Sequence, residues 1–359
     1  MATRRRGVNF PWLLAIGLAV APAAQAQSLV ACRALPDDGE RLACYDRLAG
    51  DGGTAAVASA ANSPAGGPEA APNAPLALAG RPEPAAAGLT PQSPLGEAWE
   101  LDPGERGRIL RIRSYKPVYV LPYFHSRRPN RQPQSPAPGR SSPPLDDLSA
   151  NEIKFQMSFK TKLAEDVFGS NGDLWFGYTQ SSHWQAYSGQ DSRPFRETNY
   201  EPEAMFVWRT DYQLLGWRGR LLSLGINHQS NGRSQPLSRS WNRVIFAAAF
   251  ERDDWTLTLR PWWRLAEGAD DDNPDISDYL GRADIHLLRR WGDRQLSLLL
   301  RHSLRGGDNN RGAVQVDYAF PIAGELRGHL QWFSGYGESL IDYNHRGTYY
   351  GVGVSLIAW

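Results

Sequence analysis

The sequence is poor in cysteine, in net charge and in long apolar runs. Its 359 residues carry 39 basic and 38 acidic side chains, a balance that gives no strong field for attracting a polyanion, so we expect no nucleic-acid partner. Beyond the N-terminus, no apolar run reaches the roughly 20 residues that a membrane-spanning helix needs. This absence excludes a helical membrane protein.

Only two cysteines are present, Cys32 and Cys44, and both lie in a segment at 27–50 that we expect to be helical. In an oxidising compartment, such a pair most simply forms a disulfide across a small helical hairpin. Two free thiols are the alternative. A metal site would need more ligands than this segment contains.

The N-terminal segment 1–26 has the three regions of a secretory signal peptide. Arginines at 4–6 are followed by the apolar run 12–20 and by Ala-Gln-Ala at the end, which predicts cleavage after Ala26 and export. Residues 51–105 are rich in alanine, proline and glycine and contain few large apolar side chains. Such a composition cannot bury enough surface to offset chain entropy, so we expect a flexible linker there.

The remaining domain, residues 106–359, shows repeated alternation of apolar and polar residues, which is the period of a β-strand with one apolar face. The pattern predicts about twelve strands, each of the length expected for tilted strands that cross a membrane. The expected strands are at 109–123, 152–164, 173–186, 198–214, 217–229, 240–252, 254–266, 277–290, 294–305, 310–320, 324–336 and 347–359.

The alternation by itself fits two architectures. Trp255, Leu257 and Leu259 share one strand face, and Thr256 and Thr258 share the other. A soluble sandwich would hide the apolar faces inside, whereas a membrane barrel would turn them outward. Export, an aromatic C-terminal residue and abundant tryptophan and tyrosine, which membrane interfaces favour, indicate an all-β fold, a twelve-stranded antiparallel transmembrane β-barrel.

Connection lengths alternate along the chain and indicate how such a barrel is oriented. The loops 187–197, 230–239, 267–276 and 337–346 are long, and the connections between them are short. With the N-terminal segment in the periplasm, the short turns fall on the periplasmic side and the long loops face outside. Pro261 lies within an expected strand, where it cannot donate a ladder hydrogen bond, so we expect a bulge there.

Polar chemistry is concentrated in residues 228–242, which read H-Q-S-N-G-R-S-Q-P-L-S-R-S-W-N. His228 and Ser230 continue the apolar face of one expected strand, and Asn242 lies on one face of the next with aliphatic and aromatic residues. A hydroxyl, an imidazole and a carboxamide so placed can act as a nucleophile, a general base and the group that holds the base in its working tautomer. The alternative is that they are ordinary polar residues at the end of a loop.

The longer pattern resembles the outer membrane phospholipase A family, whose catalytic Ser-His-Asn set lies in this motif. The resemblance implies a bacterial outer-membrane barrel that hydrolyses acyl ester bonds of glycerophospholipids and lysophospholipids. Ser230 would be the nucleophile, His228 the base and Asn242 the residue that orients it. Further matching motifs are Y-T-Q at 178–180, P-F-R-E-T-N-Y-E-P at 194–202, D-D-N-P-D at 271–275 and S-G-Y-G-E-S-L-I-D-Y-N at 334–344.

The resemblance also implies an oxyanion donor, a calcium site and a homodimer. The backbone N–H of Gly232 matches the family's oxyanion donor. The backbone oxygens of Arg233 and Ser238 match the Ca²⁺ ligands of one subunit, and Ser192 matches the serine that the other subunit supplies. Gln180 matches a glutamine of the dimer interface. From the residues alone, the three calcium ligands would be ordinary loop residues, and Gln180 would be a polar residue at the membrane surface.

One position departs from the family pattern. Gln235 stands where the family has an aspartate that is associated with a further calcium position, and a neutral amide is a weaker ligand for this ion. This leaves a second calcium site open. The sequence therefore predicts a calcium-dependent phospholipase A that dimerisation activates, and the rival prediction is a non-enzymatic barrel such as a porin.

Overall fold

The computed structural model describes residues 37, 39–41, 93–189 and 194–357. The chain divides into two compact units, Met1–Arg81 and Pro82–Trp359. In the first unit, residues 39–41 are helical, and the Asp37 carboxylate accepts a hydrogen bond from the N–H of Glu40 at 2.9 Å. The predicted signal peptide, both cysteines and most of the predicted linker lie outside the described residues.

The second unit is built mainly of β-strands, with a few short helical turns. The strands are β1 (Ile112–Ser114), β2 (Val118–Ser126), β3 (Asn151–Ala164), β4 (Asp173–Trp184), β5 (Phe195–Leu214), β6 (Trp217–Ser230), β7 (Ser240–Arg252), β8 (Trp255–Leu265), β9 (Ala283–Trp291), β10 (Arg294–His302), β11 (Gly312–Ala323), β12 (Leu326–Tyr336) and β13 (Arg346–Ile357). The helical turns are α3 (Pro94–Trp99), η1 (Pro103–Glu105), η2 (Gly268–Asp270), η3 (Ile276–Asp278) and η4 (Gly307–Asn309). No helix in the described residues is long and apolar enough to cross a membrane.

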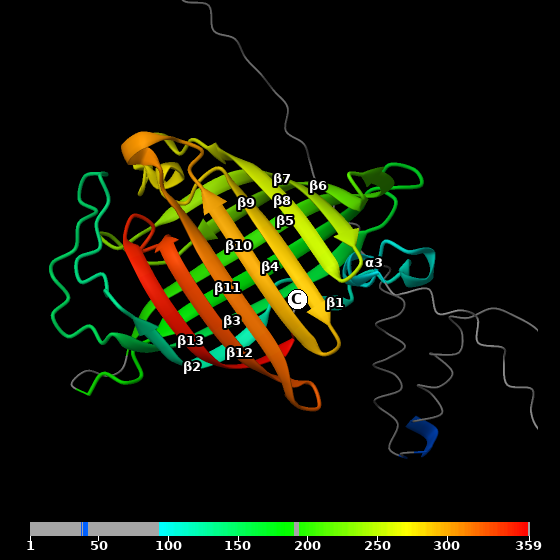
Figure 1. Ribbon diagram of the computed structural model, residues 1–359, viewed down its shortest axis with the longest axis horizontal. Helices are drawn as coiled ribbons and strands as arrows, with labels where there is room; N and C mark the ends of the chain where they lie inside the picture. Colours follow the sequence, from blue (N-terminus) through cyan, green and yellow to red (C-terminus); the bar gives the residue numbers. More distant parts are fainter. Residues whose placement is uncertain (1–36, 38, 42–92, 190–193, 358–359) are drawn as a thin grey trace, which may run out of the picture. The chain divides into compact units, whose positions relative to one another are not determined.

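Strands β2 to β13 close into an antiparallel barrel of twelve strands (Figure 1). Each strand pairs with its neighbours along the chain, and β13 pairs with β2 to complete the ring. The strand predicted at 109–123 is divided, because β1 and β2 both pair with β3 and Pro117 lies between them. Proline has no N–H with which to continue a ladder. The predicted twelve-stranded antiparallel barrel is confirmed.

Two details of the predicted strands are wrong. The strand expected at 277–290 begins at Ala283, because the residues before it form the turn η3. The bulge expected at Pro261 is absent, since the pairing of β7 with β8 keeps one register along its whole length. The missing N–H is tolerated because the next one, of Trp262, still donates to the carbonyl oxygen of Arg282 at 2.9 Å.

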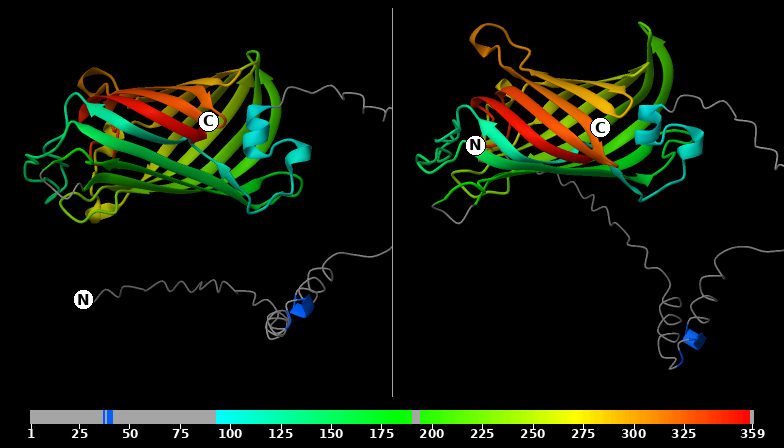
Figure 2. Two further views of the ribbon diagram at one scale, coloured as in Figure 1. Left: turned by 90° about the horizontal axis from the view of Figure 1, so that it is seen from below. Right: turned by 60° about the horizontal axis from the view of Figure 1, so that its bottom comes forward.

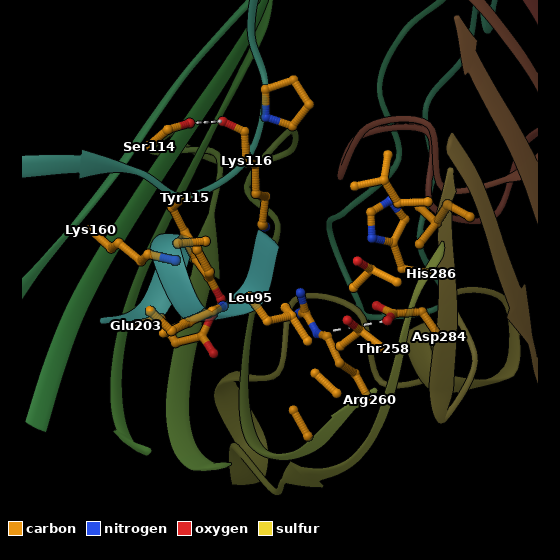
Figure 3. A pocket seen from close by; sticks show the side chains of 18 of the residues that line it. Leu95, Ser114, Tyr115, Lys116, Lys160, Glu203, Thr258, Arg260, Asp284 and His286 are labelled. Carbon is orange, nitrogen blue, oxygen red and sulfur yellow. Dashed lines mark hydrogen bonds and ion pairs between the residues drawn. The ribbon is translucent and has the colours of Figure 1, made fainter. Parts of the chain in front are cut away.

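The barrel turns its polar face inward and its apolar face outward. Thr256, Thr258 and Arg260 of β8 line a cavity of about 600 Å³ inside the barrel (Figure 3), whereas Trp263 and Leu265 of the same strand are exposed. A soluble sandwich would bury its apolar faces, so this alternation belongs to a membrane barrel. Other exposed apolar side chains on the strands include Leu222, Leu224, Ile226, Phe246, Ile285, Leu296, Leu300, Leu330 and Val352.

Charged side chains inside the barrel form ion pairs. Lys116 Nζ lies 2.7 Å from one oxygen of Glu201, and Arg243 lies 3.3 Å from the other. Arg260 faces Asp284 at 3.7 Å (Figure 3). Such pairing offsets part of the cost of removing these charges from bulk water. The wall of the cavity is polar, and basic side chains outnumber acidic ones along it.

The segment before the barrel packs into the end that carries the short turns (Figure 1 and Figure 2). Leu95 is buried in an apolar cluster with Trp175 of β4. The N–H of Leu95 and the hydroxyl of Ser93 both donate to the Glu251 carboxylate, at 2.6 and 2.7 Å. Residues 93–105, within the range predicted as linker, are therefore folded, because their few large apolar side chains find partners at this end of the barrel.

Long loops gather at the opposite end and support the hairpin formed by β6 and β7. The hydroxyl of Ser135, in the loop between β2 and β3, donates to the backbone oxygen of Asp272 at 2.7 Å. A buried cluster joins β7 and β8 to the loops after β8 and β12, and its members are Trp241, Ile245, Trp262, Ile276, Leu280, Leu340 and Tyr343. This packing holds the end of the hairpin in place.

Candidate active site

The β6–β7 hairpin brings the predicted catalytic residues together at the long-loop end of the barrel. His228 is the direct partner of Asn242 in the ladder between the two strands. His228 and Ser230 follow Ile226 on the outward face of β6, and His228 and Ile226 are both exposed. Ser230 and Asn242 are half-buried. The three predicted residues therefore share one outward patch near the rim, above a belt of exposed apolar side chains.

The residues between them point the other way. Gln229 and Trp241 line the interior cavity, and the Trp241 Nε1–H donates to the Gln229 side-chain oxygen at 2.8 Å. Because side chains alternate across a strand, the cavity lies on one face of the sheet, and His228, Ser230 and Asn242 lie on the other. The interior cavity is therefore not the place where His228, Ser230 and Asn242 would meet a substrate.

Two hydrogen bonds define the state of the histidine. His228 Nδ1 lies 2.8 Å from Asn242 Oδ1, and Asn242 Nδ2 donates to Glu267 Oε1 at 2.8 Å. Because an ionised carboxylate only accepts hydrogen bonds, the amide NH₂ must face Glu267 and the amide oxygen must face the ring. His228 then carries its proton on Nδ1, and its Nε2 is a proton acceptor, as a general base requires.

Ser230 stands two places beyond His228 on the same strand face, so its hydroxyl projects beside the imidazole. Within the described residues, no hydrogen bond of the Ser230 hydroxyl is recorded. Contacts between a nucleophile and its base are often long before substrate binds and shorten in the complex. The shared strand face therefore places the Ser230 side chain next to that of His228.

Asn231 organises the loop that follows Ser230. Its side-chain oxygen accepts from the N–H of Arg239 at 2.9 Å and from that of Arg233 at 3.3 Å. Its amide group donates to the backbone oxygen of Leu237 at 2.8 Å. The buried Asn231 side chain therefore joins the start of the loop to its middle and its end by hydrogen bonds.

Gly232 has a backbone conformation that favours glycine. Its φ angle is 62°, in the left-handed region, where a side chain would be strained. A Cβ at this position would also lie only 3.1 Å from the ring of Tyr200, which is the ladder partner of Ser230 on β5. The predicted oxyanion donor therefore stands in a turn that a larger residue would distort.

The calcium ligands predicted in this loop are two backbone oxygens. Within the described residues, no hydrogen bond to the Arg233 carbonyl is recorded, and the Ser238 carbonyl accepts one from the Arg239 guanidinium at 2.6 Å. A carbonyl oxygen has two lone pairs, so both atoms can still bind a hard cation.

Ser192 lies outside the described residues. The described part of the chain holds no group of three or more His, Cys, Asp or Glu residues that could bind a metal. The backbone oxygens of Arg233 and Ser238 are the kind of ligand that calcium prefers, but one chain supplies few such ligands.

Asp272, an acidic residue beside this loop, forms hydrogen bonds with side chains of the same chain. The Ser238 hydroxyl donates to its carboxylate, and Arg140 Nε donates to the other carboxylate oxygen at 2.6 Å. Gln235 is exposed on the loop. The carboxylate next to the predicted calcium ligands is thus neutralised by an ion pair with Arg140.

Gln180 is on the outward face of β4 and is half-buried. The Tyr178 hydroxyl donates to its side-chain oxygen at 3.1 Å, and its amide reaches the Ser182 hydroxyl at 3.4 Å. The chain itself therefore meets part of the hydrogen-bonding demand of this amide. These two contacts lower the cost of placing a carboxamide on the outward face of the barrel.

Glu267 lies in the loop after β8 and is half-buried. Burial raises the pKa of its carboxyl above the ordinary value, and the nearby charge of Asp271 raises this pKa further, while Arg264 and the hydrogen bond from Asn242 lower it. Arg264 is itself held by both oxygens of Asp271 at 2.6 Å. Within the described residues, the one hydrogen bond recorded for the Glu267 carboxylate is the bond from Asn242.

Neither Glu267 nor Asn231 was among the predicted site residues. Asn231 directly follows Ser230, and an asparagine in a turn is a signal for local side-chain to backbone bonds. The position of Glu267 depends on the pairing of Asn242 with Leu265 across β7 and β8, since Glu267 is the second residue after Leu265. That pairing is set by the whole β7–β8 hairpin, and no single residue indicates it.

Known proteins resemble this chain over most of its length. A family model for phospholipase A1 matches residues 95–356. A putative phospholipase A1 of Neisseria meningitidis is 39% identical over 374 residues, which are 96% of this chain and 95% of the relative. The phospholipase A1 of Escherichia coli is 42% identical over 206 residues, or 57% of this chain and 70% of the relative.

A solved structure shares the fold. The outer membrane phospholipase of Salmonella typhi, described as a dimer with bound calcium, matches with a TM-score of 0.63 and 35% sequence identity. The match covers 69% of this chain and 93% of that structure. The family model spans nearly the whole described barrel, and the relative from Neisseria is similar over nearly the full length of both chains. The chain therefore belongs to the phospholipase A1 family.

Proposed function

We propose that this phospholipase A1 family member hydrolyses acyl ester bonds of glycerophospholipids and lysophospholipids at the outer rim of its barrel. The proposed mechanism uses Ser230, His228 and Asn242, and calcium and dimerisation activate it. The protein would act in the bacterial outer membrane, with its N-terminal segment in the periplasm.

One observation carries the proposal. His228 is 2.8 Å from Asn242 on the outward face of the barrel, directly above exposed apolar residues such as Ile226. Polar groups on a face turned toward lipid are costly unless something covers them. A substrate that is itself part of the membrane would cover them, and its ester groups would lie near the membrane surface, at the height of the rim.

The first half of the reaction follows from the proton positions. The Ser230 hydroxyl oxygen would attack the ester carbonyl carbon while His228 Nε2 takes the hydroxyl proton. Asn242 would hold the imidazole by accepting from Nδ1–H, which stabilises the charged ring. When the tetrahedral intermediate breaks down, His228 would give the proton to the departing glycerol oxygen. The acyl group then remains on Ser230.

The second half repeats these steps with water. A water molecule would lose a proton to His228 Nε2 and attack the acyl carbonyl, and the proton would return to the Ser230 oxygen as the fatty acid leaves. Each tetrahedral oxyanion needs donors, and the backbone N–H of Gly232 is the proposed one. The left-handed backbone at Gly232, two residues after Ser230 and just past the end of β6, supports this assignment.

The backbone oxygens of Arg233 and Ser238 would hold calcium together with Ser192 of a second copy. Calcium, when bound, would supply positive charge close to the developing oxyanion. The structure of the Salmonella typhi relative is described as a calcium-bound dimer, which supports the same assembly here. The small number of ligands in one chain also supports a shared site, because calcium prefers six to eight oxygen ligands.

Hydrolysis by the purified full chain tests the proposal. The protein would be assayed in mixed micelles of detergent and phospholipid, with calcium and with a chelator, and fatty acid release would be followed. We expect turnover with calcium, little turnover with the chelator and none from Ser230→Ala. A wild-type barrel that is folded and dimeric in calcium, yet releases no fatty acid, would favour the non-enzymatic alternative.

A further inference from the structure

We infer that Glu267 is a positioning residue of the active site, the fourth in an outward-facing chain of side chains that runs from Ser230 through His228 and Asn242. The inference rests on the proposed function, since it assumes that Asn242 orients the base. It adds an acidic residue to a catalytic set whose other orienting member is neutral.

The register of the barrel places Glu267 beside Asn242. Asn242 pairs with Leu265, the last residue of β8, and Glu267 comes just before the turn η2. Residues two apart on an extended chain project to the same side, so Glu267 continues the face that carries Asn242. The result is the 2.8 Å hydrogen bond from Asn242 Nδ2 to Glu267 Oε1.

This bond decides which way the Asn242 amide points. A carboxamide has one oxygen and one NH₂ group at nearly the same distance from its centre, and His228 by itself could bond to either. If the amide turned over, its oxygen would face the Glu267 carboxylate and its NH₂ would face Nδ1 of His228. Two acceptors would then oppose each other, and the ring would keep its proton on the wrong nitrogen for catalysis.

Glu267 also supplies negative charge behind a neutral residue. The charged groups near it are Asp271, Arg264 and, when protonated, His228. Arg264 is held by Asp271 through both carboxylate oxygens, and within the described residues no ion pair of Glu267 is recorded. The negative charge of Glu267 can therefore interact with the imidazole through the hydrogen bonds of Asn242. It would stabilise the imidazolium that forms when Ser230 gives up its proton.

Kinetics across a pH range test this role. Glu267→Gln keeps the size of the side chain and an oxygen that can accept, but it removes the charge, and Glu267→Ala removes both. Asp270→Asn is the matched control, because Asp270 is an exposed acidic residue of the same loop. Values of kcat and KM would be measured from pH 5 to pH 9 in mixed micelles with saturating calcium, alongside Asn242→Ala and Ser230→Ala. A gel-shift assay for folded barrel would accompany each variant.

We expect Glu267→Ala to lower kcat about tenfold with little change in KM, which is the effect of losing one charge-assisted hydrogen bond. Glu267→Gln should lose less and should move the acid limb of the kcat/KM profile to lower pH, because a neutral neighbour makes the base weaker. Asp270→Asn should behave as wild type. The double variant with Asn242→Ala and Glu267→Ala should be no slower than Asn242→Ala alone, since the two residues act through one path.

Two different failures can be told apart. If Asn242→Ala is slow while Glu267→Ala and Glu267→Gln keep wild-type kcat and pH profiles, the inference about Glu267 is overturned and the proposed mechanism stands. If Ser230→Ala retains wild-type turnover, the proposed function itself fails. Should Glu267→Ala not fold, the isosteric Glu267→Gln variant decides the question through its pH profile alone.

Discussion

His228 and Asn242 are direct cross-strand partners in the β6–β7 ladder, and their side chains are joined at 2.8 Å from Nδ1 to Oδ1. A ladder partner is held by backbone hydrogen bonds on both strands, so the pair needs no flexible loop to bring it together. The orientation of the proposed base is therefore a property of the sheet. Ser230, two places further on β6, is held by the same sheet.

The use of an amide at this place has a physical reason. A carboxylate on the outward face would have to be removed from water next to the membrane, which is expensive, whereas a carboxamide carries no net charge. Glu267 lies in the loop beyond the strand and is half-buried, where water can still solvate it. The arrangement keeps a negative charge in reach of His228 without placing it among lipid chains.

Replacing the nucleophile should abolish turnover and leave the barrel intact. Ser230→Ala removes the attacking oxygen, so we expect hydrolysis to fall by about a thousandfold or more. The residue is half-buried on the outer rim, so we expect the barrel to fold without its hydroxyl. Fatty acid release and the heat-dependent gel shift of the folded barrel would be compared with wild type. Near-normal hydrolysis by this variant would show that the nucleophile is another group.

Removing the amide should weaken catalysis without stopping it. Asn242→Ala leaves Ser230 and His228 in place but lets the ring rotate and exchange tautomers, so we expect a loss of about tenfold to a hundredfold in kcat. KM should change little, because the amide binds the base and not the substrate. A variant with unchanged kcat would mean that His228 is oriented by something else.

Ser192 should link calcium activation to dimerisation. Ser192→Phe would replace a hydroxyl that we propose as a ligand across the two-fold axis, so the calcium concentration for half activation should rise by about tenfold or more. The fraction of crosslinked dimer should fall over the same calcium range. Calcium would be titrated while activity and crosslinking are followed together. Full calcium-dependent activity in a protein shown to be monomeric would contradict this prediction.

Gln180 should make a modest contribution to the dimer. Its amide already bonds to Tyr178 and more weakly to Ser182, so a partner subunit would add only part of its hydrogen bonding. We expect Gln180→Ala to raise the dimer dissociation constant about threefold to tenfold, where each tenfold corresponds to about 1.4 kcal/mol. Sedimentation equilibrium in detergent at several protein concentrations would measure it. An unchanged constant would place this side chain outside the interface.

Glu267 should cost stability when it is charged. Burial and Asp271 raise the pKa of its carboxyl in the folded protein, so folding favours the protonated form. A group with a raised folded pKa stabilises fully below its unfolded pKa and loses that contribution as pH rises through the folded value. Glu267→Gln should therefore match or exceed wild type in Tm at pH 8.

The comparison with acidic pH gives the control for this prediction. Well below the ordinary glutamate pKa of 4.5, the Glu267 carboxyl is protonated in both the folded and the unfolded state of wild type. Wild type then carries no buried charge at this position, so the difference in Tm between Glu267→Gln and wild type should shrink or reverse at that pH. Thermal unfolding in micelles would be followed by circular dichroism at both pH values. A variant that is less stable than wild type at pH 8 only would mean that the carboxylate holds the loop, and that its role is structural.

Local patterns in the sequence were sufficient for much of this protein. Alternation between strand faces depends only on neighbouring residues, so the strands and their two faces could be read directly, including Thr256 and Thr258 against Leu257 and Leu259. The proposed catalytic motif is compact for the same reason. His228, Ser230 and Asn242 belong to one hairpin, and a hairpin is set by residues close together in the chain.

Contacts between distant segments were decided only by the closed barrel. The alternation by itself could not say which face meets lipid, because sandwich and barrel share it. The closed barrel decides it, since its apolar side chains are exposed and its polar ones line the interior. The folding of residues 93–105 depends on Trp175 and Glu251, which are far along the chain. Glu267 meets Asn242 only through the register of β7 with β8. Register depends on the side-chain pattern of both strands and on the turn that joins them, so it belongs to the whole pair of strands and to no single residue.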